Sequence, residues 1–353
     1  MIKISYVMNV CNGEPFIFYN LKSIYKHAHE IIIVEGAYEG FAKNPHSSDN
    51  TIDVIKNYPD PEGKIKLIMK DSFWKNRKDM CNAFLKEATG DIIWQLDYDE
   101  FYFHRTHNFV RELFEKHRDI DLIIFPIKEF IGSLNYESKG YINIAGLSKV
   151  RRVFRYHRGA VWKTQRPPTL IYPNGSEIVS RRIINAEYMA DKGHFMYHYT
   201  ILFRTQILNK IRYYKKLHKS YISMDKFLTN VWDEFKNPFA VSMSNVGLSY
   251  LIKHEGRHPQ VIYEMIREID NKVFSFHPKL KKIENYIDSP LYYFDVLMIE
   301  VINNLLFKRK ISPLLLIIFP TFFIGAIFYS KYRFIFIVIF NKVFHSFKKL
   351  VLH

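Results

Sequence analysis

Apolar and polar residues follow two different periods along residues 1–127. The run "EIIIVEG" is almost continuously apolar, which is typical of a central parallel strand covered on both faces. The segment "EPFIFYNLKSIY" instead places its apolar side chains at helical spacing, with a proline suited to the first turn. The chain is therefore expected to begin with alternating strands and helices.

The same two periods recur along this region. Strands are predicted at "KISYVMNV", "EIIIVEG", "KIKLIM", "DIIWQLD" and "DLIIFPI". Helices are predicted between them at "EPFIFYNLKSIY", "SSDNTIDVIKNY", "FWKNRKDMCNAFL" and "NFVRELFEKH", and Gly90 is expected to end the third helix. Strands that alternate with helices indicate βαβ units, so the predicted class is α/β with a mostly parallel sheet flanked by helices.

The rest of the chain is less regular and then helical. Residues 128–190 contain turn signals such as "QRPPTL" and "YPNGSE", which indicate short strands and loops. From about residue 200, "ILFRTQILNKIRYYKKLHKS" keeps apolar side chains on one face and basic side chains on the other. Helical patterns continue through residue 307, so a helical extension is predicted over residues 221–305.

Composition narrows the class of partner. The 353 residues are 48% hydrophobic and 16% aromatic, which allows a large core and excludes a disordered chain. Lys and Arg number 51 against 35 Asp and Glu, a formal net charge of +16. This excess favours nucleic acid, phosphate-bearing substrates or an anionic membrane surface. Two cysteines, Cys11 and Cys81, cannot build a disulfide framework or a multi-cysteine zinc site, and their apolar surroundings indicate reduced core residues.

The C-terminal segment differs from the rest of the chain. Residues 311–328 carry no charge, and a second apolar run, "FIFIVIF", follows at residues 334–340. Basic residues flank both runs: Lys308, Arg309, Lys310, Lys331, Arg333, Lys342, Lys348 and Lys349. Residues 306–353 are therefore predicted to associate with the cytoplasmic face of a membrane, with a buried terminal helix pair as the alternative. The N-terminus "MIKISYVMNV" lacks the features of a signal peptide, so the remaining chain is expected in the cytosol.

Three acids stand within four positions at the end of the strand "DIIWQLD": Asp97, Asp99 and Glu100. A carboxylate at the end of a buried strand loses hydration and requires a partner or a metal. On an extended strand, residues i and i+2 point the same way, about 6–7 Å apart, so Asp97 and Asp99 are predicted to act together. Such a pair suits Mg²⁺ or Mn²⁺ with substrate phosphates, and the alternative is an exposed acidic turn.

Polar residues also follow the neighbouring strands. Ligands of parallel α/β sheets bind outside the carboxyl ends of the strands. The first strand ends near Asn9, with Asn12 and Glu14 just beyond it, and Glu35 stands at the end of the second. These residues are expected to share one crevice with Asp97.

Five segments, in this order and spacing, resemble the GT-A nucleotide-sugar glycosyltransferases, most closely family 2 and its relatives. They are "YVMNVCNGEPFIFYNLKSI", "EIIIVEGA", "SSDNTIDVI", "FWKNRKDMCNAFL" and "WQLDYDEFY". The resemblance covers residues 1–130 and extends more loosely to residue 219. It implies a catalytic domain over residues 1–220, with a nucleotide-sugar half at 1–127 and an acceptor half at 128–220 that completes a metal site.

The resemblance implies roles for residues at the strand ends. In such enzymes an acid after the second strand reads the nucleotide base, and Glu35 stands there, although this chain has "EGA" where the family usually has "DGS". A basic residue after the third strand contacts base or phosphate, and Arg77 is best placed, with Lys75 and Lys78 nearby. A solvated charge on a helix face is the alternative for Arg77. The implied nucleotide-sugar contacts are Asn9, Asn12, Glu14, Glu35, Arg77 and Asp97.

A histidine far along the chain often completes the metal site in this family. The segment "DKGHFMYHYT" offers His194 and His198, of which His198 is preferred, and a structural role is the alternative for either. The implied metal ligands are therefore Asp97, Asp99 and His198. The expected metal is Mn²⁺ or Mg²⁺, and imidazole suits Mn²⁺ better than Mg²⁺.

Transfer of a sugar to a hydroxyl also requires a base for the acceptor. The candidates in the acceptor half are Glu129, Glu137, Glu187 and Asp191. Because Glu187 and Asp191 directly precede the histidine segment, Asp191 is predicted first and Glu187 second.

The leading interpretation is a metal-dependent, hexosyltransferase-type glycosyltransferase at the cytoplasmic face of a membrane. Its partners are a nucleotide-diphosphate sugar and an acceptor, a surface glycan or lipid-linked saccharide, as in polysaccharide biosynthesis. A nucleotidyltransferase of similar fold is an alternative, but "NVCNGEPF" lacks the Gly-rich basic loop that holds a triphosphate. A non-catalytic membrane or nucleic-acid binder is another; nucleic acid is not expected, because the basic residues are widely spread.

Overall fold

The computed structural model describes residues 1–40, 42–140, 149–165, 168–178, 182–206, 208, 249–277, 284–293 and 295–296. The chain divides into two compact units, residues 1–303 and 304–353, and the residues described all belong to the first. The predicted membrane-associating tail, residues 306–353, lies outside them. Within the described ranges, no helix combines the length and apolar character needed to cross a membrane.

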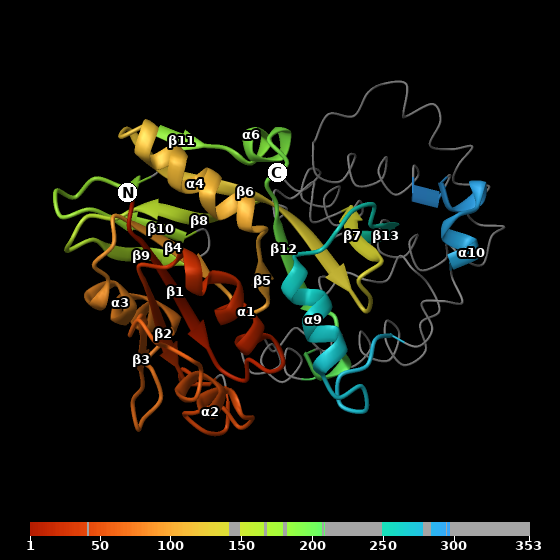
Figure 1. Cartoon of the computed structure of the whole chain (residues 1–353), viewed down its shortest axis with the longest axis horizontal. Coiled ribbons are helices and arrows are strands. Elements are labelled where there is room, and N and C mark those ends of the chain that lie inside the picture. Colours follow the sequence, from red (N-terminus) through yellow and green to blue (C-terminus); the bar gives the residue numbers. More distant parts are fainter. Residues whose placement is uncertain are drawn as a thin grey trace, which may run out of the picture. The chain divides into compact units, whose positions relative to one another are not determined.

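Strands and helices alternate through the first part of the chain, and strands dominate the part that follows (Figure 1). The strands are β1 (Ile4–Val10), β2 (Glu30–Glu35), β3 (Ile65–Ile68), β4 (Ile92–Leu96), β5 (Glu100–Phe101), β6 (Ile120–Ile131), β7 (Tyr136–Gly140), β8 (Lys149–Arg155), β9 (Val161–Gln165), β10 (Pro168–Ile171), β11 (Arg182–Ile184), β12 (Met196–Ile201) and β13 (Ser249–Lys253). The helices are α1 (Phe16–Ile24), α2 (Thr51–Lys56), α3 (Arg77–Glu87), α4 (His104–Lys116), α6 (Ala186–Asp191), α9 (Gln260–Glu268) and α10 (Glu284–Ile287), with a 3-10 turn η1 (Tyr25–His27).

Four strands form a parallel layer in the order β3-β2-β1-β4. Asn9 of β1 stands opposite Val34 of β2, and Met8 stands opposite Leu96 of β4. Because the four strands run the same way, their carboxyl ends meet at one edge of the sheet. The predicted α/β class and its parallel βαβ units are confirmed by this layer.

Helices cover both faces of this layer, as the alternation along β1 shows. Tyr6 and Met8 pack on one side, in a core that also contains buried residues of α1 and α4. Val7 faces the other side and packs in a core with buried residues of α3. With apolar layers on both faces, β2 is buried at every position, as its continuous apolar run predicts.

The sheet continues beyond β4 through strands of mixed direction. β8 lies between β4 and β6 and runs antiparallel to both, so β6 points the same way as β4. The far end of β6 pairs with β12 in parallel and with β7 antiparallel. β12 also pairs antiparallel with the short β5. Residues 196–201 therefore lie beside residues 100–101, although about a hundred residues of chain separate them.

Several elements differ from the sequence prediction. β5 is too short to show the alternation of apolar and polar residues that predicts a strand. It forms by pairing with β12. α4 begins at His104 rather than at Asn108, so its first turn includes polar residues outside the apolar pattern. β6 is continuous across residue 127, where the sequence divides the predicted halves. The region predicted as a helical extension contains β13, which pairs with β7, a tertiary partner that no local pattern reveals.

Candidate active site

The three acids of the predicted metal motif lie at a tight turn between β4 and β5. β4 ends at Leu96, and β5 begins at Glu100. The amide of Glu100 donates to the carbonyl of Asp97 at 3.1 Å, which closes the turn. The carboxylate of Glu100 accepts the amide of Asp97 at 3.2 Å. Both bonds hold the chain in a reversal at the carboxyl end of β4.

The prediction that Asp97 and Asp99 share one direction assumes an extended backbone, in which side chains two positions apart align. Residues 97–100 form a turn instead, so this basis for the alignment is absent. Asp97 instead shares a partner, Arg152, with Glu100. Asp99 contacts His198. The acidic turn thus presents its carboxylates to two different surroundings.

An asparagine of α1 holds the turn in place. The side-chain nitrogen of Asn20 lies 2.9 Å from the carbonyl oxygen of Glu100 and 3.1 Å from that of Tyr98. It also lies 3.5 Å from the carbonyl oxygen of Asp97. Asn20 is fully buried, where carbonyl groups require a donor from the protein. The position of the turn is therefore fixed by α1.

Two arginines hold the carboxylate of Asp97. Arg77, the first residue of α3, donates to its Oδ1 at 2.8 Å, and Arg152 of β8 donates to its Oδ2 at 3.0 Å. Arg152 also donates to the carboxylate of Glu100. Arg152 and Glu100 are buried, whereas the side chains of Arg77 and Asp97 are 28% and 27% exposed. A ligand at this edge therefore meets Arg77 and Asp97 first.

Burial raises the pKa of Glu100 to about 7, and the Arg152 guanidinium opposes that rise. Burial disfavours the charge on Arg152, but Glu100 and Asp97 hold its pKa above the usual range. Arg152 therefore remains charged. Removing it leaves acids without their buried counter-charge, which is strongly destabilising.

Arg152 and Asn20 are the site residues that the sequence analysis missed. The one signal for Arg152 is an arginine inside the partly apolar strand "KVRRVFR". Period-2 alternation in the sequence places Arg152, which is buried, with Val150 and Phe154, whereas Arg151 beside it falls with Lys149 and Arg155. Asn20 is a polar residue on the apolar face of a predicted helix, and such residues usually satisfy a buried backbone group.

His198 lies between two carboxylates. Its Nε2 is 3.5 Å from Oδ1 of Asp99, and its Nδ1 is 4.0 Å from Oε1 of Glu129. Strand pairing explains this placement, because His198 of β12 stands opposite Glu129 of β6 and Glu100 of β5. Asp99 is buried, whereas the side chains of His198 and Glu129 are 21% and 18% exposed. Two of the three predicted metal ligands, Asp99 and His198, are in contact.

The chemistry of this pair fits part of a divalent-cation site. A carboxylate oxygen and an imidazole nitrogen 3.5 Å apart are donors that Mn²⁺ accepts. Asp97 is held by the guanidinium groups of Arg77 and Arg152. Across the described part of the chain, no group of three or more His, Cys, Asp or Glu side chains is arranged to hold a metal ion. Asp99 and His198 therefore suit a cation that takes other ligands from substrate phosphate and water.

The loop after β1 is bonded to residues 46–51, which we call the clasp. Asn12 donates its amide to Ser47 at 2.9 Å, and its side-chain oxygen accepts a clasp amide at 2.7 Å. The amides of Gly13 and Glu14 donate to other clasp side chains at 2.7 and 3.1 Å. Three successive backbone amides in the loop after β1 thus donate hydrogen bonds to side chains of the clasp.

The clasp is also fastened to Glu35. The Glu35 side chain is fully buried at the end of β2, with Oε2 2.8 Å from Nδ1 of His46. Its Oε1 accepts the amide of Ser47 at 2.7 Å. In this arrangement a nucleotide base reaches the carboxylate only if His46 or Ser47 moves.

Asn9 lies at the same edge, as the last residue but one of β1. Its side-chain amide nitrogen is 3.1 Å from the sulfur of Cys81. Burial raises the pKa of Cys81 to about 11 and that of Cys11 to about 12, so both remain thiols at neutral pH. Both cysteines are free, in keeping with the prediction of reduced residues.

The predicted catalytic bases of the histidine segment lie on or beside α6. Glu187 is exposed and forms an ion pair with Lys149. Asp191 is exposed at the end of α6. His194 is buried, and its ring stacks on Phe109 of α4 with centroids 4.1 Å apart. Glu187 thus contacts β8 and His194 contacts α4, rather than the acidic turn.

The remaining two candidate bases have different surroundings. Glu137 is buried against Lys128, Lys139 and His254. Burial tends to raise its pKa, but the His254 bond and the two lysines lower it to about 2. A carboxylate held so firmly ionised is a poor proton acceptor at neutral pH. Of the four candidates, Glu129 is the one that contacts a predicted metal ligand.

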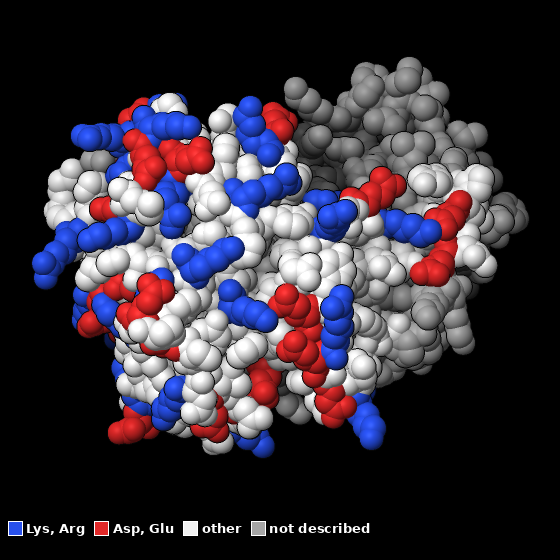
Figure 2. Space-filling model, in the orientation of Figure 1, with Lys and Arg blue, Asp and Glu red and all other residues white. Residues whose placement is uncertain are grey.

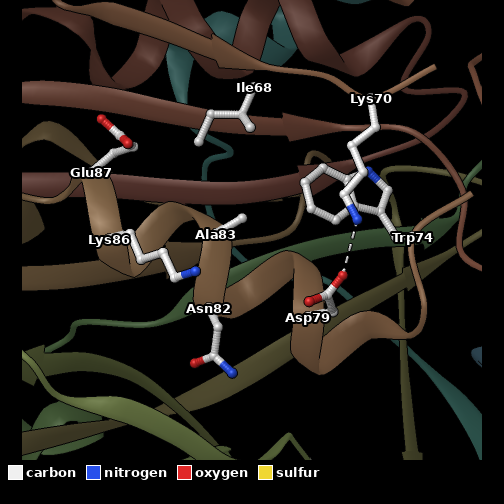
Figure 3. A pocket seen from close by; sticks show the side chains of 8 residues that line it. All are labelled: Ile68, Lys70, Trp74, Asp79, Asn82, Ala83, Lys86 and Glu87. Atoms are coloured by element: carbon white, nitrogen blue, oxygen red, sulfur yellow. Dashed lines mark hydrogen bonds and ion pairs between the residues drawn. The ribbon is translucent and has the colours of Figure 1, made fainter. Parts of the chain in front are cut away.

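A cavity of about 340 Å³ lies elsewhere, between the end of β3 and α3 (Figure 3). Lys70 extends across the ring of Trp74, and its ammonium lies 3.2 Å from Asp79. The lining is of mixed charge and includes no residue of the predicted site. A second cavity of about 310 Å³, beside β11 and α4, likewise includes none of them. The acidic turn therefore remains the candidate site on chemical grounds.

Comparison with known proteins finds similarity in structure. No family model matches the sequence, and no curated protein matches it. TarS of S. aureus, residues 1–349, aligns over 69% of this chain and 76% of its own length, at 16% identity and a TM-score of 0.37. Its complex with UDP-GlcNAc aligns over 44% of this chain and 45% of its own, at 18% identity and a TM-score of 0.32.

A second similar structure is glucosyl-3-phosphoglycerate synthase from Mycobacterium tuberculosis, in complex with Mn²⁺, UDP and glucosyl-3-phosphoglycerate. It aligns over 37% of this chain and 44% of its own length, at 20% identity and a TM-score of 0.26. The chain thus spans less than half of this synthase and of TarS in its UDP-GlcNAc complex.

Proposed function

We propose that this chain is a metal-dependent glycosyltransferase that moves a sugar from a nucleotide-diphosphate sugar to an acceptor hydroxyl. One observation carries the proposal: the acidic turn divides its carboxylates at the carboxyl ends of parallel strands. Asp97 lies with the partly exposed Arg77, and Asp99 lies with His198. A nucleotide-diphosphate sugar carries ribose hydroxyls and an anionic diphosphate, which need an acceptor and a cationic site side by side.

The residues of the site have separate tasks in such a reaction. Asp97 offers oxygens to a ribose hydroxyl, and Arg77 donates to phosphate. Asp99 and His198 hold the divalent cation, Mn²⁺ or Mg²⁺, which when bound stabilises the negative charge of the leaving diphosphate. Arg152 is buried behind Asp97 and keeps the turn neutralised when the site is empty of ligand.

The transfer itself exchanges one bond for another. The bond between the anomeric carbon and the diphosphate oxygen breaks, and its electron pair leaves with the nucleoside diphosphate. The acceptor oxygen forms the new bond to that carbon, and its proton passes to a carboxylate base. Asp191 and Glu187 remain the sequence-based candidates for this base in the acceptor half.

The alternatives have less support. A nucleotidyltransferase uses the loop after the first strand to hold a triphosphate. Here the backbone amides of Asn12, Gly13 and Glu14 in that loop donate to side chains of the clasp. Nucleic-acid binding calls for a continuous basic face. Figure 2 shows Lys and Arg interspersed with Asp and Glu on the face it presents.

The acceptor and the location belong to the same proposal. The basic and apolar residues 306–353 support attachment to the cytoplasmic face of a membrane, where the acceptor is a surface glycan or a lipid-linked saccharide. UDP and UDP-GlcNAc, which are bound in the TarS crystals, are donors or products of the proposed class.

A panel of nucleotide sugars tests the proposed function. The full-length protein in detergent is incubated with UDP-, GDP- and dTDP-sugars, with Mn²⁺, with Mg²⁺ or with a chelator. We expect at least one donor to bind and to hydrolyse slowly, and both effects to disappear with the chelator. Failure of every donor to bind in a metal-dependent way would contradict the proposal.

A further inference from the structure

The geometry points to Glu129 as the residue that orients His198 toward a cation shared with Asp99, a positioning role that rests on the proposed function. From the sequence alone, Glu129 is a candidate for the base that accepts the acceptor proton. The structure instead places its carboxylate against the ring nitrogen of His198 that faces away from Asp99.

The two ring nitrogens of His198 have different neighbours. A metal binds the unprotonated nitrogen of a neutral imidazole. Nε2 is the nitrogen near Asp99, at 3.5 Å, so it is the one that takes a cation held by both side chains. The ring proton then resides on Nδ1, which faces Glu129. A carboxylate in that place accepts the proton and fixes both the tautomer and the ring orientation.

The separation of 4.0 Å between Nδ1 and Oε1 is that of an ion pair rather than of a hydrogen bond. Such contacts are often long without ligand and shorten in the complex. The backbones need not move for this, because β6 and β12 already place Glu129 and His198 in register.

Glu129 approaches His198 from β6, whereas Asp99 approaches it from the acidic turn. Glu129 therefore offers His198 a carboxylate at Nδ1, and Asp99 lies at Nε2. The arrangement matches the carboxylate–histidine–metal sequence found in many metal sites, in which the outer carboxylate strengthens binding about 10–100-fold.

Binding of Mn²⁺ to the full-length protein tests the role without measuring turnover. Titration calorimetry, with Mn²⁺ alone and with Mn²⁺ plus UDP, GDP or dTDP, compares wild type with Glu129→Gln, which keeps the shape and removes the charge. We expect Glu129→Gln to weaken Mn²⁺ binding about 10–100-fold and the melting temperature to stay near that of wild type. The exposed Glu112→Gln on α4 is the matched control and is expected to bind Mn²⁺ as wild type does.

A double-mutant cycle separates orientation of His198 from a general effect of charge. In a His198→Asn background, Glu129→Gln is expected to cause no further loss of Mn²⁺ affinity. An equal loss in both backgrounds would show that Glu129 acts through its charge alone and would overturn the role. Unchanged Mn²⁺ affinity together with reduced turnover would also overturn it, because that result identifies Glu129 as a base.

Failure of this role is distinguishable from failure of the proposed function. If wild type binds Mn²⁺ and Glu129→Gln binds it equally well, the role of Glu129 is wrong and the metal-dependent transferase stands. If wild type binds no Mn²⁺, either alone or with any of the three nucleotides, the metal site of the proposed function is wrong. The role of Glu129 is then wrong as well, because it depends on that site.

Discussion

Asp97 and Asp99 are two positions apart in the sequence and contact different side chains. Arg77 and Arg152 neutralise Asp97, whereas Asp99 lies next to the imidazole of His198. A cation is repelled by guanidinium groups and attracted by a carboxylate beside a neutral imidazole. At the scale of single residues, the two acids of one short motif are therefore expected to respond differently to the same substitution.

Asp99→Asn is expected to abolish metal-dependent binding of nucleotide sugar, because it removes the carboxylate that we propose as a ligand of the cation. The measurement is calorimetric titration of the donor found in the panel, with and without Mn²⁺. Asp71→Asn, at an exposed position, is the control and is expected to bind as wild type does. Unchanged affinity in Asp99→Asn would remove that residue from the site.

Glu35→Gln separates two roles for a buried acid. If Glu35 fastens the clasp through His46 and Ser47, the substitution weakens binding of every nucleotide by a similar factor, roughly tenfold for about 1.4 kcal/mol. If Glu35 reads the base, the preference among UDP, GDP and dTDP changes instead. We expect the uniform loss. Competition titration with the three nucleotides measures the ratio directly, and a changed ratio would restore Glu35 as the base-reading residue.

Arg152→Met is expected to lower the free energy of unfolding by about 3–5 kcal/mol, because it leaves Glu100 and Asp97 without their buried counter-charge. Urea denaturation followed by circular dichroism measures this loss. The neighbouring Arg151→Met, which removes a less buried guanidinium of the same strand, is the matched control with a smaller effect. Equal losses in the two variants would contradict a special role for Arg152.

At the scale of elements, prediction from the sequence succeeds where a pattern is local. "EIIIVEG" and "DIIWQLD" become β2 and β4, because a buried parallel strand needs continuous apolar residues. The sequence predicts those site residues that lie at the ends of strands. Asp99, Glu35 and Asn9 all lie at the carboxyl edge of the parallel layer. The partners Arg152 and Asn20 were not predicted, because each acts through a contact between segments distant in sequence.

The junction of β7 and β13 provides a test of stability against pH. Glu137 of β7 is bonded to His254, just after β13, and to two lysines. Its pKa is lowered from 4.5 to about 2 in the folded chain. A carboxyl group with a depressed folded pKa stabilises the fold above its unfolded pKa, and this contribution is lost as pH falls through the folded value.

Glu137→Gln is therefore expected to lower the free energy of unfolding by about 3 kcal/mol at pH 6–7. The gap between the variant and wild type should narrow below pH 4.5 and close near pH 2. Urea denaturation over this pH range measures it, with Glu112→Gln as an exposed control. A gap that stays constant with pH would mean that packing rather than ionisation of Glu137 is responsible.

At the scale of the whole molecule, the proposed attachment to a membrane is predicted to depend on residues 306–353. Deletion of residues 306–353 removes both apolar runs and their basic flanks, so the truncated protein is expected in the soluble fraction after cell lysis. Fractionation followed by immunoblotting measures the distribution. A truncated protein that stays with the membranes would show that another part of the chain binds them.

The pairing of β12 with β5 has a consequence for the order in which the molecule becomes competent during folding. β1, β2, β3 and β4 follow one another along the chain, and contacts between nearby segments form fastest. His198 meets Asp99 only after a loop of about a hundred residues has closed. On the ribosome, the parallel layer is therefore able to assemble before His198 reaches Asp99, so the proposed cation site is completed only after the layer has formed.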